Sequence, residues 1–165
     1  MTKEMIRIAN CSGFYGDKLS VAKDMVEGGP IDVLTGDYLA ELTMTILYNQ
    51  KIKRGEDHGY VGTFLKQFKD VAKSTQEKNI KIVSNAGGLN PKAMALEVEK
   101  IIDELNLKLK VAYIEGDDLI PEFQKLSEAG EKFKNLDNEI NLSDYPKKPI
   151  TANAYLGAWG IKEAL

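Results

Sequence analysis

Small polar side chains and glycines gather in five short segments of the sequence, and these segments are where ligand chemistry is expected. The segments are residues 10–13, 35–37, 84–88, 115–118 and 151–153. Each follows a short apolar run. The free backbone N–H groups of the helix N-termini that follow most of these segments are well suited to holding phosphate or carboxylate ligands. We therefore expect one ligand site built from several of these segments.

Asp117 and Asp118 are the candidate catalytic residues. Neighbouring carboxylates can act as general acid and base, or can bind a divalent cation such as Mg²⁺. Capping of a helix would need only one of the two, which favours a functional role for the pair. The sequence leaves the identity of any metal open.

A second set of residues is expected to bind the ligand. It consists of small polar residues and glycines of the five segments, together with two tyrosines that could wall a pocket. Its members are Asn10, Ser12, Gly13, Tyr15, Gly36, Asp37, Tyr38, Ser84, Asn85, Gly87, Gly88 and Asn153. For any single segment, turn formation and helix capping are the alternative explanation of the same residues. Asp37 in particular is also a candidate N-cap for the helix that follows it.

The single cysteine, Cys11, and the single histidine, His58, limit the available chemistry. They exclude an intrachain disulfide and a zinc site with four Cys or His ligands. We interpret Cys11 as a small buried or pocket-lining residue and His58 as a solvated loop residue. Gly13 and Gly16 do not match a phosphate-loop pattern, because only two residues separate them.

Strands that alternate with helices are expected to position these segments. Short apolar runs predict strands near residues 6–9, 31–34, 80–84 and 110–114, and a short strand or buried segment at 149–153. Apolar residues at helical spacing predict helices between them, and Asn90 before Pro91 predicts a capped helix start. This order indicates the α/β class, specifically a Rossmann-like three-layer sandwich: a mostly parallel sheet with helices on both faces. The polar segments would then meet at one edge of the sheet.

Length and composition indicate one ordinary globular domain over residues 1–165. The formal net charge is −3, which argues against nucleic acid as a partner. Residues 130–148 are rich in charged and amide side chains and are interpreted as a surface insertion.

The sequence has neither a signal peptide pattern nor an apolar run long enough for a membrane helix, so a cytoplasmic protein without membrane association is expected.

Several long motifs resemble the N-terminal region of the acyclic terpene utilisation family. They lie at residues 8–17, 27–44, 82–91, 115–118 and 151–158. Together they cover nearly the whole chain apart from residues 130–148. The family is associated with the breakdown of branched terpenoid acids such as citronellic and geranic acid.

The resemblance implies a catabolic enzyme domain for a branched small acid or its coenzyme A thioester, with the reaction type unassigned. Family members are usually several hundred residues long. A homo-oligomer, or a partner subunit that supplies a C-terminal part, is therefore expected. The alternative is a non-catalytic binding or assembly subunit that needs such a partner chain. Whether the chain is itself an enzyme stays open at this point.

Overall fold

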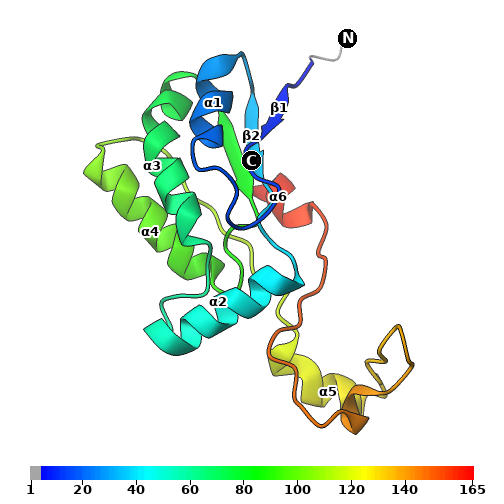
Figure 1. Cartoon of the computed structure of the whole chain (residues 1–165). Helices are drawn as coiled ribbons and strands as arrows, with labels where there is room; N and C mark the ends of the chain where they lie inside the picture. Colours follow the sequence, from blue (N-terminus) through cyan, green and yellow to red (C-terminus); the bar gives the residue numbers. More distant parts are fainter. Residues whose placement is uncertain (1–4) are drawn as a thin grey trace.

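Three short segments rich in β-branched residues form a parallel sheet in the computed structural model, which describes residues 5–165 (Figure 1). The strands are β1 (Ile8–Asn10), β2 (Val33–Gly36) and β3 (Lys81–Ser84), in the order β1-β2-β3. Ala9 pairs with Leu34, and Leu34 pairs with Ile82. These three strands confirm the predictions near residues 6–9, 31–34 and 80–84. The first four residues of the predicted domain lie outside the described part.

Six helices and two 3-10 turns lie between and after the strands in residues 5–165. They are α1 (Val21–Gly28), α2 (Glu41–Arg54), α3 (Gly62–Glu77), α4 (Pro91–Glu104), α5 (Phe123–Glu128) and α6 (Trp159–Ala164), with 3-10 turns η1 (Ile120–Glu122) and η2 (Leu142–Asp144). Asn90 caps α4 as predicted, since its Oδ1 accepts a hydrogen bond from the Ala93 N–H at 3.1 Å. None of the helices in residues 5–165 combines the length and apolar composition that crossing a bilayer requires.

One face of the sheet is covered by helices. Helix α1 packs on β1, β2 and α3, and α3 packs on α4 (Figure 1). The strand order advances in a single direction, and right-handed crossovers then place successive helices on the same side. Leu34, Val26 and Val71 form part of the fully buried core beneath them.

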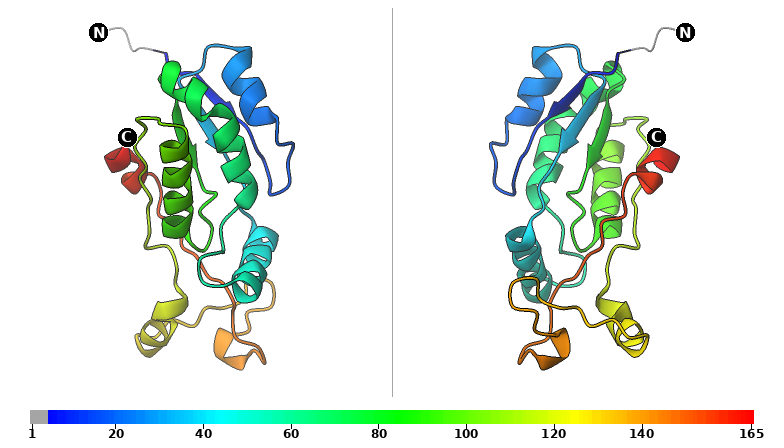
Figure 2. Two further views of the ribbon diagram at one scale, coloured as in Figure 1. Left: turned by 90° about the vertical axis from the view of Figure 1, so that its left-hand side faces the viewer. Right: turned by 90° about the vertical axis from the view of Figure 1, so that its right-hand side faces the viewer.

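The opposite face of the sheet is open in the described part of the chain. Side chains alternate along a strand, so Ile8, Val33 and Val83 point away from the helices. Ile8 is 66% exposed, and the two valines are half-buried. Figure 2 shows this face towards the viewer on the right, with α6 to one side of it. The α/β class is confirmed, whereas helices over both faces are not present in residues 5–165.

The predicted strand at residues 110–114 is wrong, because this segment pairs with no strand in residues 5–165. Side-chain exposure in residues 107–111 still alternates as it would in a strand. Leu107, Leu109 and Val111 pack partly against the core. Lys108 and Lys110 are exposed. The segment at 149–153 contributes only an isolated antiparallel bridge between Asn153 and Asp118. Residues 130–148 contain loops and η2, and in Figure 1 they lie near α5.

Candidate functional site

Asn10 connects the carboxyl ends of β1 and β2. Its Nδ2 donates to the Ser12 carbonyl at 2.9 Å, and its Oδ1 accepts from the Thr35 Oγ1 at 3.2 Å. The Asp37 N–H also donates to the Ser12 carbonyl, at 3.0 Å. The polar segments at 10–13 and 35–37 therefore meet at one edge of the sheet.

Asn85 connects the ends of β2 and β3 and holds the Asp37 carboxylate. The Asn85 Nδ2 donates to Asp37 Oδ1 at 2.6 Å, while the Asn85 Oδ1 accepts from the Tyr38 N–H at 2.8 Å. Ser84 adds a second link, because its Oγ donates to the Gly36 carbonyl at 3.1 Å. Asp37 is exposed, and its Oδ2 accepts no hydrogen bond from residues 5–165. This leaves one oriented carboxylate oxygen facing solvent at the sheet edge.

Asp37 does not cap the following helix. Helix α2 begins at Glu41, and its N-cap is Ala40 without a side-chain cap. The capping alternative for Asp37 is therefore wrong, and the carboxylate is held across the strands instead.

Asp17 is a residue at this edge that the sequence reasoning missed. Its carboxylate accepts from the Gly13 N–H at 3.1 Å and from the Lys18 N–H at 2.8 Å. The two backbone N–H groups, that of Gly13 first, lower the pKa of Asp17. An anionic ligand at the Gly13 N–H would have to replace this carboxylate. The spacing of Asp17 four residues after Gly13 was the available signal.

The glycines of the candidate site differ in what requires them. A Cβ on Gly36 would lie 2.6 Å from the Tyr38 ring, and one on Gly87 would lie 2.7 Å from Pro91. Gly88 has φ +54°, and its Cβ would meet the Leu47 side chain and the Gly59 carbonyl. Gly13 has an ordinary φ and open space within 4 Å. Packing or backbone conformation explains three of these glycines but not Gly13.

The two predicted pocket tyrosines have different surroundings. Tyr38 is 2% exposed, lies edge-on to Phe64, and donates from its hydroxyl to Gln67 Oε1 at 2.6 Å. The Cys11 Sγ lies 3.7 Å from the same hydroxyl, and burial raises the pKa of both groups. Tyr15 is half-buried, and its hydroxyl accepts from Gln50 Nε2 at 3.2 Å.

Asp117, Asp118 and Asn153 form a second group. Asn153 Nδ2 donates to Asp117 Oδ2 at 2.9 Å, and Asp118 Oδ1 accepts from the Ile120 N–H at 2.9 Å. No hydrogen bond within residues 5–165 joins this group to Asn10, Asp37 or Asn85. The described residues also contain no cluster of three or more His, Cys, Asp or Glu placed to hold a metal ion.

Two hollows lie away from the carboxyl edge. One, of about 450 Å³, is lined by residues including Arg7, Gly28, Gly29 and Lys78 at the opposite edge of the sheet. The other, of about 290 Å³, lies among residues 133–149. A ligand could bind in either hollow instead of at the carboxyl edge, so a binding experiment has to distinguish these three positions.

The parallel sheet and its helices define an α/β protein. Polar residues at the carboxyl ends of its strands are hydrogen-bonded to each other and form a candidate ligand site at one edge of the sheet. The chain belongs to the acyclic terpene utilisation family, because the model of the acyclic terpene utilisation family protein AtuA matches residues 6–165. No curated protein and no solved structure matches the chain significantly.

Proposed function

We propose that this chain is a catabolic enzyme domain that binds a branched small acid, or its coenzyme A thioester, at the carboxyl edge of the sheet. Membership of the terpene utilisation family supports a role in the use of branched isoprenoid compounds. The reaction type is not assigned. In the complete Rossmann-like arrangement, further polypeptide would cover the open face of the sheet.

The observation that carries the proposal is the Asp37–Asn85 pair. Asn85 fixes one carboxylate oxygen of Asp37 at 2.6 Å and leaves the other exposed. An orientation set by a neighbouring amide is what a ligand-binding or proton-transferring carboxylate needs. Gly13 lies beside Ser12 at the same edge. A Cβ on Gly13 would meet nothing within 4 Å, so packing does not explain this glycine.

Asp117 and Asp118 are proposed to supply the acid–base groups, with Asn153 positioning Asp117. The hydrogen bond of 2.9 Å from Asn153 Nδ2 supports that positioning role. Mg²⁺ is retained as a test ligand because exposed carboxylates are its usual protein ligands.

Thermal unfolding in the presence of ligand tests this proposal. Geranic acid, its coenzyme A thioester, coenzyme A alone and Mg²⁺ would each be added to the wild type, Asp37→Asn and the exposed control Asp70→Asn. A ligand present at 100 times its Kd stabilises by about 2.7 kcal/mol, which raises Tm by roughly 5–10 °C for a chain of this size. For the coenzyme A thioester, whose hydroxyl and amide groups can donate to Asp37 Oδ2, we expect that shift in the wild type and in Asp70→Asn, and a much smaller shift in Asp37→Asn.

Two outcomes would contradict the proposal. One is the absence of a shift with every ligand at concentrations far above a plausible Kd. The other is an equal shift in the wild type and in Asp37→Asn when the coenzyme A thioester is added.

The open sheet face favours a second candidate function, a binding or assembly subunit that needs a partner chain. Turnover of a branched acyl thioester by the isolated chain would exclude this alternative. Turnover only after reconstitution with a second polypeptide would support it.

A further inference from the structure

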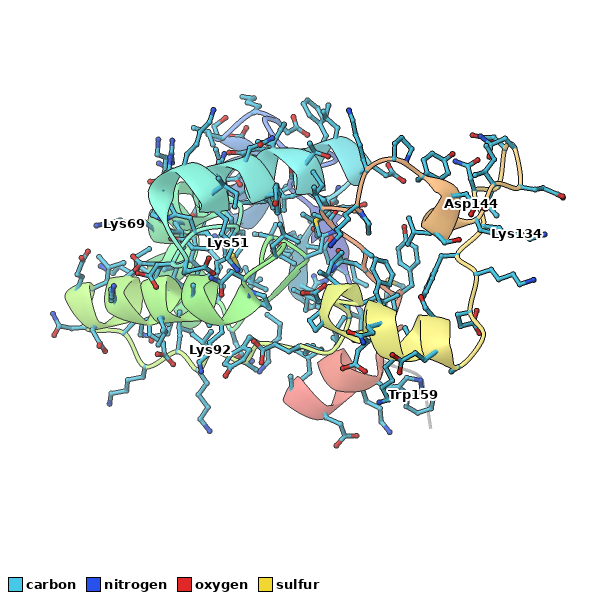
Figure 3. All side chains as sticks on the ribbon, turned by 90° about the horizontal axis from the view of Figure 1, so that it is seen from below. Lys51, Lys69, Lys92, Lys134, Asp144 and Trp159 are labelled. Carbon is cyan, nitrogen blue, oxygen red and sulfur yellow. The ribbon has the colours of Figure 1, made fainter. Side chains whose placement is uncertain are left out.

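A buried polar pair joins helix α3 to the residue that follows Asp37. Tyr38 is 2% exposed and Gln67 is 3% exposed, and the Tyr38 hydroxyl donates to Gln67 Oε1 at 2.6 Å. Gln67 belongs to the buried stripe of α3, as Phe64 does. Lys69, two residues further along the helix, lies instead at the periphery of the molecule (Figure 3). A polar side chain therefore occupies a helix position where an apolar one normally packs.

Stability alone does not account for this pair. A hydroxyl and a carboxamide lose their hydrogen bonds to water on burial, and the bond between them mainly offsets that cost. Two apolar side chains of the same shape would fill the same space with little change in stability. What a satisfied buried polar pair adds is one fixed arrangement of the elements that it joins.

Tyr38 is held by its backbone as well as by its side chain. Its N–H donates to Asn85 Oδ1 at 2.8 Å, and the Cys11 Sγ lies 3.7 Å from its hydroxyl. Its ring folds back over Gly36, where a Cβ would lie 2.6 Å from the ring. The chain directly after Asp37 is thus fixed to the ends of all three strands.

We propose that Tyr38 is a positioning residue, whose hydroxyl, held by Gln67, fixes the backbone of residues 37–38 and so orients the Asp37 carboxylate towards the ligand. This role rests on the proposed function of Asp37 at the carboxyl edge. The Asp37 N–H, which donates to the Ser12 carbonyl at 3.0 Å, holds the other side of the same residue. Tyr38 then acts from within the core and does not touch the ligand itself.

A set of three variants separates positioning from stability. Tyr38→Phe and Gln67→Met each leave the other partner buried without its hydrogen bond, and each should lower Tm by roughly 3–8 °C. The double variant removes both polar groups and should return Tm close to the wild-type value. Thr75→Val is the matched control, because it removes another buried hydroxyl of α3, whose bond to the Ala72 carbonyl at 2.9 Å stays within the helix.

The side-chain amide of Asn85 reports the position of Asp37 in the absence of ligand. One Nδ2 proton donates to the Asp37 carboxylate, so the two Nδ2 proton signals should be well separated in NMR spectra of the wild type and of Thr75→Val. The separation should narrow in Tyr38→Phe and stay narrow in the double variant, because recovery of stability does not restore the link to Gln67. A double variant with the wild-type separation would overturn the proposal.

Binding of the coenzyme A thioester of geranic acid gives the second readout. Tyr38→Phe and the double variant should each bind about 3- to 10-fold more weakly than the wild type, the equivalent of about one hydrogen bond. Thr75→Val should bind as the wild type does. Affinity that recovers together with Tm in the double variant would show a merely structural role and overturn the proposal. Absence of binding to the wild type would contradict the proposed function instead, and the Asn85 signals would still decide the positioning role.

Discussion

The Asp37 side chain is the clearest functional candidate among single residues, because a neighbour fixes it while one of its oxygens stays accessible. Asn85 donates to it from Nδ2 and accepts the Tyr38 N–H with Oδ1. One amide thus sets both the carboxylate and the backbone that carries it. Asp37 and Asn85 were both predicted as ligand residues, but their contact joins positions 48 residues apart in the sequence, so periodicity alone did not indicate it.

The Arg7–Asp32 pair leads to a prediction about pH. The Arg7 side-chain hydrogen bond lowers the pKa of Asp32 from 3.8 to about 2, and Arg7 Nε and Nη2 contact the carboxylate at 3.0 and 2.9 Å. A pKa that is lower in the folded state stabilises the protein above the unfolded-state pKa, and this contribution is lost as the pH falls towards 2. The free-energy difference of unfolding between wild type and Asp32→Asn should be constant from pH 7 to about 5 and shrink between about 4 and 2.

Urea unfolding at a series of pH values measures this difference. Asp70→Asn, at an exposed position of α3, serves as the matched control for the loss of one carboxyl. A wild-type advantage over Asp32→Asn that persists undiminished at pH 2 would contradict the assigned role of the ion pair.

At the scale of elements, local sequence signals predicted where helices and strands begin better than they predicted which strands pair with each other. Asn90 and Pro91 marked the beginning of α4 because a cap depends on adjacent residues. The alternating pattern around Val111 was real but did not create a strand, since a strand needs an aligned neighbour supplied by the rest of the chain. Asp37 is not the predicted cap because α2 begins at Glu41 with Ala40 as its N-cap, and the Asp37 carboxylate instead contacts Asn85, which is distant in sequence.

The turn after β3 yields a prediction about stability. Gly88→Ala should destabilise the fold by about 2–4 kcal/mol, since it adds left-handed backbone strain and crowding against Leu47 and the Gly59 carbonyl. Gly13→Ala should change stability by no more than about 0.5 kcal/mol, because its Cβ meets nothing within 4 Å. Denaturant titration of the two variants against wild type measures both values. Equal destabilisation by the two substitutions would show that the distinction between these glycines is wrong.

At the scale of the whole molecule, the sequence predicted the α/β class and the family, and both are confirmed. The predicted convergence of five polar segments is realised in two groups. Residues 10–13, 35–37 and 84–88 are linked by hydrogen bonds, whereas Asp117 and Asn153 bond to each other. The sequence predicted five strand ends at one edge, but in the described residues 5–165 three strands form the sheet. Hydrophobic periodicity could not predict whether helices cover both faces of the sheet, because that depends on which polypeptide covers the open face.

Mapping of backbone amide shifts on adding the coenzyme A thioester of geranic acid tests the central claim most directly. The account predicts that the largest shifts fall at residues 10–13, 36–38 and 84–88, and that Asp37→Asn reduces them. Saturable shifts confined to the hollow beside Arg7 and Gly28, or to residues 133–149, would contradict a ligand site at the carboxyl edge of the sheet.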